Sequence, residues 1–288
     1  MSTLYLVSTP IGNLGDFTPR AAETLTAVSR ILAEDTRRSR VLADRAGSTA
    51  PLVSLHQHNE RERIERILEW MSRGEDLALV SDAGTPIVSD PGGRVVTAVL
   101  AAGHDVVPIP GPSAVLAALA ASGLPGERFT FLGFPDRKGA ARRDLVRRIA
   151  RSTETVVLFE SPVRVPRLLV DLLEACGADR RVAVARELTK VHETILRGTL
   201  REAVAYYEET PPKGEVTLVV EGVPAEQPAP LDEEWVREQA RELLDGGMRP
   251  SRAARELARR FEVGRNDAYR IVHSVTDAQA PGDGPEQE

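Results

Sequence analysis

The stretch 77–93 carries the residues best suited to holding a ligand. It reads LALVSDAGTPIVSDPGG, an apolar run followed by a loop rich in Asp, Ser, Thr, Pro and Gly. The apolar run predicts a buried strand of a parallel sheet, and we expect Asp90 and Pro91 to start the next helix as its N-cap and first-turn residue. Open α/β sheets bind ligands at the carboxyl ends of their strands, and this loop exceeds the roughly 2–6 residues of ordinary connections. It is therefore predicted to be a binding loop in which Asp82 accepts hydrogen bonds; an ordinary strand-to-helix connection is the alternative.

A second group of charges follows a predicted strand at 30–33. Glu34 and Asp35 precede Arg37, Arg38 and Arg40. One interpretation is a helix start, because acids near the amino end interact favourably with the helix dipole. The other is a loop that holds substrate, and the sequence leaves both open.

Two histidines, His56 and His58, follow the next predicted strand. Zinc sites need three or four ligands, and nothing nearby completes such a set. We expect a loop that faces solvent or substrate and no metal site.

Arginines gather in two predicted helical regions. In the helix predicted at 137–151 the basic residues are almost of one sign: Arg142, Arg143, Arg147, Arg148 and Arg151. A solvated face is the ordinary explanation, but such a face also suits phosphate groups. Residues 232–274 predict three helices, with Ser251 capping the second and the third ending at Ser274. Because two short helices flank Gly264, this end resembles a helix-turn-helix, and a dimerisation bundle is the alternative.

Composition limits the class of protein. The 288 residues are 42% hydrophobic and 28% charged, as in soluble globular proteins, and no apolar run approaches the roughly 20 residues of a membrane span. A strand at the N-terminus leaves no room for a signal peptide, and the single Cys176 rules out a disulfide within the chain, so we expect a cytoplasmic protein. The net charge of −6 means that any nucleic-acid contact must come from a local patch.

The order of predicted elements indicates two α/β domains and a helical end. We expect a parallel sheet in 1–123, a mixed sheet in 124–222, a proline-rich linker at 223–231, the three helices of 232–274 and a disordered tail at 275–288. The Gly-x-Gly-x-x-Gly fingerprint and the Walker lysine are both missing, which argues against a nicotinamide-binding Rossmann domain and a phosphate-loop NTPase.

Six motifs carry a family resemblance when taken in order. They are LVSTPIGNLGDFTPRA, AEDTRRS, LVSDAGTPIVSDPG, VPIPGPSA, ARELTKVHET and KGEVTLVVEG. This series resembles the bacterial small-subunit ribosomal RNA cytidine 2′-O-methyltransferases, which belong to the tetrapyrrole-methylase (class III methyltransferase) fold superfamily. The resemblance spans roughly residues 3–222, and the helical end looks like the accessory domain of many members.

The resemblance implies two α/β domains that enclose S-adenosylmethionine in a cleft, usually in a homodimer. Carried over position by position, it assigns the following cofactor contacts: Pro10, Asp82, Ala83, Gly84, Thr85, Val88, Ser113, Ala114, Glu160 and Leu188. The tetrapyrrole enzymes of the superfamily have a Gly-Asp-Pro loop where this chain has Ala-Gly-Thr-Pro, which argues against a tetrapyrrole substrate.

The activity implied is S-adenosylmethionine-dependent methylation of a cytidine 2′-oxygen in the decoding region of 16S ribosomal RNA, either free or in the small ribosomal subunit. A base near the hydroxyl would accelerate the reaction. The candidates are Glu187, Glu34 and Asp35, with Arg37, Lys190, Arg142 and Arg143 as substrate contacts. Glu187 could instead form a structural ion pair with Arg186 or Lys190. Two other functions stay open: a tetrapyrrole-type methylase on the same fold, and a non-enzymatic nucleic-acid binder that uses residues 230–288.

Overall fold

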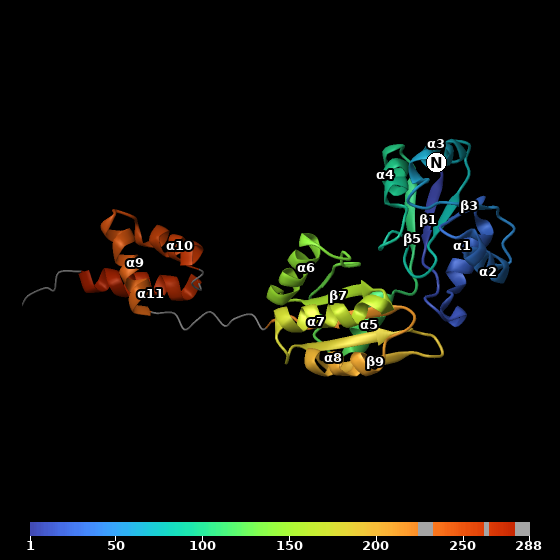
Figure 1. Cartoon of the computed structure of the whole chain (residues 1–288). Coiled ribbons are helices and arrows are strands. Elements are labelled where there is room, and N and C mark those ends of the chain that lie inside the picture. Colours follow the sequence, from blue (N-terminus) through green and yellow to red (C-terminus); the bar gives the residue numbers. More distant parts are fainter. Residues whose placement is uncertain (224–232, 262–264, 280–288) are drawn as a thin grey trace, which may run out of the picture. The chain divides into compact units, whose positions relative to one another are not determined.

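Within residues 1–223, the first sheet has five parallel strands in the order β3-β2-β4-β1-β5 (Figure 1). The strands are β1 (Thr3–Val7), β2 (Arg30–Ala33), β3 (Leu52–Ser54), β4 (Leu77–Val80) and β5 (Asp105–Ile109). The computed structural model describes residues 1–223, 233–261 and 265–279. All four residues of β4 are buried, as its apolar run predicts, because parallel sheets are covered on both faces.

Four helices cover the two faces of this sheet. They are α1 (Pro19–Ala27), α2 (Thr36–Ala46), α3 (Glu60–Ser72) and α4 (Gly93–Ala101), and a 3-10 turn spans Leu14–Asp16. On one face α1 and α2 pack against alternate strand residues such as Ile31 and Val80. On the other face α3 and α4 pack against Leu32 and Leu79. The period of two along each strand therefore divides the core into two layers.

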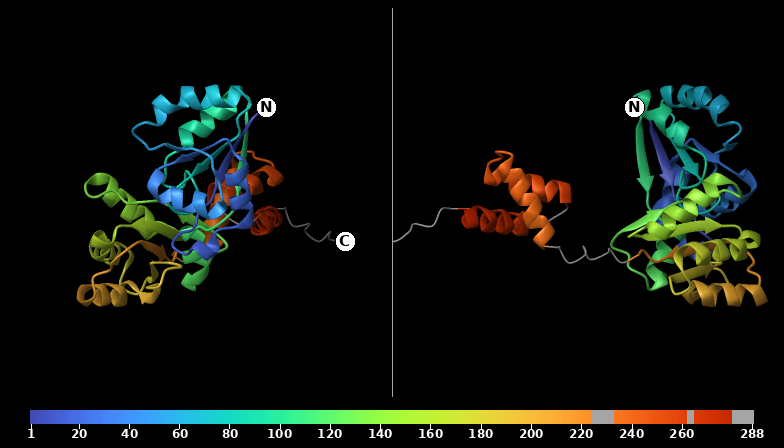
Figure 2. Two further views of the ribbon diagram at one scale, coloured as in Figure 1. Left: turned by 90° about the vertical axis from the view of Figure 1, so that its right-hand side faces the viewer. Right: turned by 60° about the vertical axis from the view of Figure 1, so that its left-hand side comes forward.

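The second sheet, also within residues 1–223, is mixed, as predicted, with the order β6-β7-β10-β8-β9. Its strands are β6 (Phe129–Phe131), β7 (Thr155–Glu160), β8 (Arg181–Arg186), β9 (Thr194–Thr199) and β10 (Val216–Val220). Only the β6–β7 pair is parallel among these described strands. One face is covered by α6 (Ala140–Arg151), α7 (Val165–Cys176) and α8 (Leu200–Glu209), and a 3-10 turn at Pro162–Arg164 leads into α7. Figure 2 shows both sheets from two further directions.

Helix α5 (Ala114–Ser122) changes the predicted boundary between the two domains. Its buried residues Val115, Ala118 and Leu119 pack with Val157 of β7 and Val219 of β10, on the second sheet. The boundary predicted at residue 123 is therefore wrong, because the chain crosses over before α5. The helix is apolar on every side, so its periodicity could not indicate which sheet it covers.

Two helices of the first 223 residues start at a capping hydroxyl, and a third departs from its predicted start. Ser113 accepts from the Leu116 N–H at the start of α5, and Thr18 accepts from the Ala21 N–H at the start of α1. Asp90 does not cap α4, which begins at Gly93.

The start of α4 is capped from another helix. Oε1 of Glu60, in the first turn of α3, accepts from the backbone N–H groups of Gly92, Arg94 and Val95 at 3.2, 2.9 and 3.4 Å. A buried carboxylate thus satisfies the free N–H groups of the first turn. Asp90 is left without a capping role.

The C-terminal unit is a separate body that begins after Val223. It contains α9 (Glu233–Asp245), α10 (Pro250–Phe261) and α11 (Arg265–Gln279), which share a core that includes Val236, Leu257 and Ile271. Ser251 lies inside α10, which starts one residue earlier at a proline, a common first-turn residue.

The structure tests the predicted C-terminal tail in part and the predicted linker hardly at all. Helix α11 runs to Gln279, so the tail predicted from residue 275 starts too early. The linker predicted at 223–231 lies outside the described residues, apart from Val223, as does the rest of the tail. Among the described residues every helix is too short or too polar to cross a membrane.

Candidate functional site

A cavity of about 400 Å³ lies within residues 1–223, at the carboxyl end of β4. Its size is that of a small-molecule site. Apolar side chains and four acids, Asp82, Asp90, Glu160 and Glu215, share its wall. The lining residues are Ile11, Arg38, Asp82, Ala83, Gly84, Thr85, Val88, Ser89, Asp90, Ser113, Ala114, Val115, Phe134, Phe159, Glu160, Ser161, Pro162, Gly214, Glu215, Val216 and Thr217.

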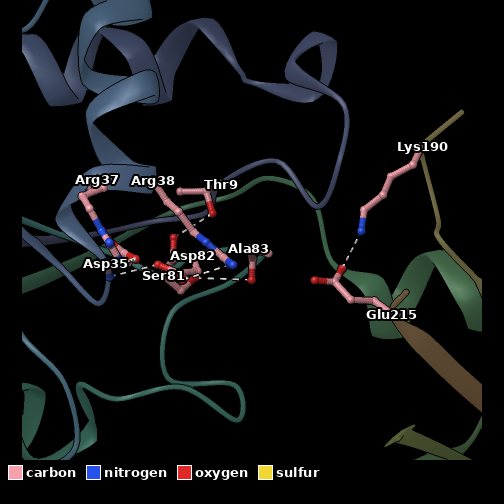
Figure 3. A network of polar contacts seen from close by, with 9 residues as sticks. All are labelled: Thr9, Asp35, Arg37, Arg38, Ser81, Asp82, Ala83, Lys190 and Glu215. Carbon is pink, nitrogen blue, oxygen red and sulfur yellow. Dashed lines mark hydrogen bonds and ion pairs between the residues drawn. The ribbon is translucent and has the colours of Figure 1, made fainter. Parts of the chain in front are cut away.

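The loop after β4 is fixed to the loop after β1 (Figure 3). Thr9 and Gly84 exchange two backbone hydrogen bonds of 2.9 and 3.0 Å, and the Thr9 hydroxyl donates to the carbonyl oxygen of Ser81 at 3.1 Å. Gly84 has a φ of +81°, and a Cβ there would lie 3.4 Å from Cγ2 of Ile11. A glycine is required here because of this left-handed backbone.

Backbone strain is confined to two loops of the described chain. Positive φ angles at residues other than glycine occur at Ile87 (+77°), Ser89 (+68°), Glu187 (+53°) and Thr189 (+66°). Each such residue costs of order 1–3 kcal/mol and persists only where the surroundings hold it. The first pair lies in the loop that forms the cavity wall, and the second lies in the turn after β8.

The charged group after β2 forms a helix start, as one interpretation of the sequence has it, and its predicted contact with substrate stays a prediction. Asp35 caps α2: its carboxylate accepts from the Arg37 N–H at 2.9 Å and pairs with the Arg37 guanidinium at 2.8 Å. The hydrogen bonds with Arg37 lower the pKa of Asp35 to about 2. Its backbone N–H donates to Oδ1 of Asp82 at 3.0 Å, while Arg38 pairs with Oδ2 at 3.2 Å (Figure 3). Asp35 and Arg37 thus form a helix start, and Arg38 and Asp82 reach the cavity.

Two carboxyl groups near Asp82 have raised pKa values. Burial and then the charge of Asp82 raise the pKa of Glu34, which does not line the cavity. Burial and then the charge of Glu34 raise the pKa of Asp90 to about 6, although a hydrogen bond from Ser81 acts in the opposite direction. Asp90 lines the cavity and is the acid that the sequence analysis assigned to a helix cap instead.

Glu187 and Lys190 form a pair in the turn after β8. The Lys190 ammonium contacts Oε1 of Glu187 at 2.8 Å. It also contacts Oε2 of Glu215 at 3.1 Å (Figure 3). Glu187 also accepts from the Glu215 N–H at 2.9 Å, and the Lys190 hydrogen bond lowers the pKa of Glu187. Arg186 bonds to the Thr194 hydroxyl instead. Of the two ion pairs considered for Glu187, the structure contains the one with Lys190, and neither residue lines the cavity.

Arg142 is buried, contrary to its predicted place on a phosphate-binding face. Its Nε donates to Oδ2 of Asp171 at 2.8 Å, and its Nη1 lies 3.7 Å from Oε2 of Glu160. Glu160 also pairs with Arg164 at 2.5 Å. Arg142 is therefore not on the exposed basic face, because helical spacing turns it toward Asp171 of α7 and Glu160 of β7, and its predicted substrate contact stays a prediction. Arg143 is exposed.

The exposed basic residues border a groove of about 540 Å³ that involves α6 and α7. They are Arg137, Lys138, Arg143, Arg147 and Arg167. Arg147 pairs with Asp144 and Arg167 with Asp171, so the groove retains excess positive charge at its other basic residues.

The structure brings together eight of the ten positions that the family resemblance assigns to the cofactor. They are Asp82, Ala83, Gly84, Thr85, Val88, Ser113, Ala114 and Glu160. Pro10 and Leu188 are not among the lining residues, but Leu188 packs in the same apolar cluster as Ile11 and Val115, which are. Sequence reasoning missed Phe134 and Phe159, whose rings lie 5.4 Å apart, because no local pattern separates them from core aromatics.

The side chains that line the cavity suit a cofactor with a flat aromatic base and a positive charge. Phe134, Phe159 and Val88 provide apolar surface, Gly84 lets the backbone approach, and Asp82 and Glu215 face the cavity with negative charge. S-adenosylmethionine has these features. Among the described residues, no three His, Cys, Asp or Glu side chains are grouped as metal ligands.

Comparison with known proteins adds the decisive observation. A family model described as tetrapyrrole (corrin/porphyrin) methylases matches residues 3–204. The ribosomal RNA small subunit methyltransferase I of Synechocystis sp. is 45% identical over 271 residues, covering 94% of this chain and 97% of that protein. The Bacillus subtilis protein of the same name is 39% identical over 275 residues, covering 96% and 94%. The chain belongs to this family. Ribosomal RNA small subunit methyltransferase I proteins are tetrapyrrole methylases by fold, and the cofactor is S-adenosylmethionine.

Other matches separate the fold from the C-terminal unit. The Thermotoga maritima member is 45% identical over 222 residues, which are 99% of that protein but 77% of this chain. The crystal structure of the methyltransferase CobJ matches with a TM-score of 0.60 at 22% identity, covering 77% of this chain and 95% of that one. Uroporphyrin-III-C-methyltransferase from Thermus thermophilus gives a TM-score of 0.54, also at 22% identity, covering 78% and 96%. At this identity the two structures show the fold alone.

Proposed function

We propose that the protein transfers a methyl group from S-adenosylmethionine to the ribose 2′-oxygen of a cytidine in the decoding region of 16S ribosomal RNA. One observation carries the proposal: eight cofactor positions implied by the family motifs line one cavity of suitable size. Named relatives at 39–46% identity are ribosomal RNA small subunit methyltransferases.

The chain's part in this reaction is mainly to position the reactants. The loop 82–88 and residues 113–114 would hold the cofactor, which supplies a methyl carbon activated by a positively charged sulfur. Because Thr9 and Gly84 lock this loop to the loop after β1, the wall is set before the cofactor arrives. Holding two reactants in line avoids most of the entropy of a bimolecular encounter, an effect worth up to about 7–11 kcal/mol.

The groove at α6 and α7 is the proposed contact with RNA phosphates. Arg143, Arg137 and Lys138 line it together with the acids Asp171 and Glu174, and none of these three basic residues forms an ion pair with another described residue. The buried Arg142 helps to hold this face in place, because its hydrogen bond to Asp171 joins α6 to α7. We expect the bound RNA to present an unstacked nucleotide, because a base that is stacked in an RNA duplex cannot enter a cavity of the protein.

The proposal also includes a homodimer and a cytoplasmic location. Light scattering of the purified protein at micromolar concentration checks the first, with a mass of twice 31.3 kDa expected. A mass of one chain at every concentration would remove the dimer and leave the activity proposal standing.

The decisive experiment supplies labelled S-adenosylmethionine, small ribosomal subunits that lack the modification, and the full-length protein. We expect label in one cytidine ribose of 16S ribosomal RNA. Label in a tetrapyrrole acceptor instead would favour a small-molecule methylase. If the protein binds RNA but calorimetry detects no heat of binding with S-adenosylmethionine, the result would favour a non-enzymatic RNA-binding protein.

The groove is tested by its salt dependence. Arg143→Ala should weaken RNA binding and lower the slope of log K against log salt by about one. Arg20→Ala, which removes an exposed arginine on α1, is the matched control. Equal slopes for both variants would show that the groove does not contact RNA phosphates.

A further inference from the structure

A second pocket, of about 420 Å³, adjoins the cofactor cavity through Asp90, which lines both. The rest of its wall comes from the loop before α3 and from the start of α4. Three of its polar side chains are exposed: Gln57, His58 and Arg94. An amide, an imidazole and a guanidinium are groups that recognise a base edge and a phosphate.

Asp90 is free to act because another carboxylate caps α4. Glu60 is 6% exposed and accepts from three N–H groups of the first turn. The anion position at this helix start is therefore already filled, and a phosphate in the second pocket would depend on the Arg94 side chain. The Asp90 carboxylate, freed from the helix start, lies in the wall between the two spaces.

The backbone on either side of Asp90 holds it in place. Ile87 and Ser89 have left-handed φ angles. After Asp90, Gly92 has a φ of +122°, and a Cβ there would lie 2.5 Å from Cδ2 of Leu79 in β4. Such a conformation, strained before Asp90 and closely packed after it, is typical of a loop whose side-chain positions matter for function.

Charged groups from every neighbouring segment face this region. Glu34 and Asp82 act on Asp90 from the loops after β2 and β4, and Ser81 donates a hydrogen bond to it. Arg38 shares the cofactor cavity, while His58, Glu60 and Arg94 share the second pocket. Burial and the two carboxylates raise the pKa of Asp90 to about 6, so at neutral pH it is ionised yet more basic than an ordinary carboxylate.

We propose that the second pocket receives the acceptor nucleotide and that the Asp90 carboxylate takes the proton of its ribose hydroxyl. This inference rests on the proposed function and names the acceptor site and base for it. In the step, the hydroxyl oxygen bonds to the methyl carbon while the carbon–sulfur bond breaks and its electron pair stays on sulfur. The sulfonium becomes a neutral thioether, and the proton passes to Asp90 and then to solvent.

The base is tested in single-turnover methylation of small ribosomal subunits. Asp90→Asn should lower the rate by about 10²–10⁴-fold, while calorimetry with S-adenosylmethionine and filter binding of RNA stay within about threefold of the wild type. The wild-type rate should rise about tenfold per pH unit below pH 6 and then level off, and Asp90→Asn should lose this dependence. Asp90→Glu should recover part of the rate.

Glu62→Gln is the control, because it removes an exposed carboxylate from the first turn of α3 without touching either space. An Asp90→Asn rate within threefold of wild type would overturn the base. So would an unchanged pH dependence in Asp90→Asn. If wild-type protein binds S-adenosylmethionine but methylates no small-subunit RNA, the proposed function fails and this inference fails with it.

The pocket is tested separately by RNA affinity. His58→Ala and Arg94→Ala should each weaken binding of small-subunit RNA by about three- to tenfold and leave the calorimetric affinity for S-adenosylmethionine unchanged. Arg61→Ala removes an equally charged, exposed residue of α3 outside the pocket and should have no effect. Equal RNA affinity for all three variants would overturn the acceptor site.

Discussion

Replacing Arg142 tests whether α6 carries a structural arginine beside its RNA-facing ones. The Arg142 side chain is 9% exposed, and its acidic partners Asp171 and Glu160 are 13% and 0% exposed. Removing one partner of a buried ion pair costs about 3–5 kcal/mol, because the other charge is left unpaired. Here Asp171 keeps Arg167 at 2.9 Å and Glu160 keeps Arg164 at 2.5 Å. We therefore expect a cost near the lower end, about 3 kcal/mol.

The assay is urea and thermal unfolding of Arg142→Ala and Arg143→Ala beside the wild type. A loss of about 3 kcal/mol corresponds to a fall in Tm of about 6–12 °C for a body of this size. Arg143→Ala should stay within about 0.5 kcal/mol, as surface changes do, and should lower RNA affinity instead. If Arg142→Ala unfolds like the wild type and loses RNA affinity, the buried network is wrong and the phosphate contact first expected for Arg142 is right.

Three further predictions concern packing and titration. Gly222→Ala should lower the free energy of unfolding by about 1–3 kcal/mol, because the added Cβ would lie 2.5 Å from the backbone of Thr153. Gly126→Ala is the control: its Cβ would meet only Leu119, at 3.8 Å, so the same denaturation series should show almost no change. The folded protein keeps the Asp90 proton up to about pH 6 while the unfolded chain loses it near pH 3.8, so the free energy of unfolding should fall between those values. Asp90→Asn should then stabilise the cofactor-free protein by about 1 kcal/mol at pH 8, allowing for solvent access, and by nothing at pH 3; equal effects at both would contradict the shift. Burial raises the pKa of Cys176, so iodoacetamide at pH 8 should modify it about tenfold more slowly in the folded than in the urea-unfolded protein.

Local patterns in the sequence predicted the helices and strands, but they could not predict contacts between residues that are far apart in the chain. The buried strand β4 and the long loop after it follow from an apolar run and a cluster of turn residues, and both are present. Asp90 looked like a helix cap because Asp before Pro is a common helix start. The competing cap, Glu60, lies 30 residues earlier, and only the fold brings it to α4.

Burial of charged groups was equally hard to predict. The arginines of α6 look alike in sequence, yet the packing of α7 decides that Arg142 is enclosed and Arg143 is not. Likewise, Glu187 and Lys190 are three residues apart in a turn, and Glu215, which completes their network, comes from the segment before β10. Most positions implied by family motifs meet at one cavity, and their contact with the cofactor stays a prediction.

The crossover of α5 bears on how the chain folds as it leaves the ribosome. The last strand of the first sheet ends at Ile109, so that sheet can close early, whereas α5 packs on strands as late as β10, which ends at Val220. Roughly 100 residues must be added in between, which takes about 5–20 s at ordinary rates of synthesis. During that interval Val115 and Leu119 have no sheet to cover, and the nascent helix is a natural place for a chaperone to bind.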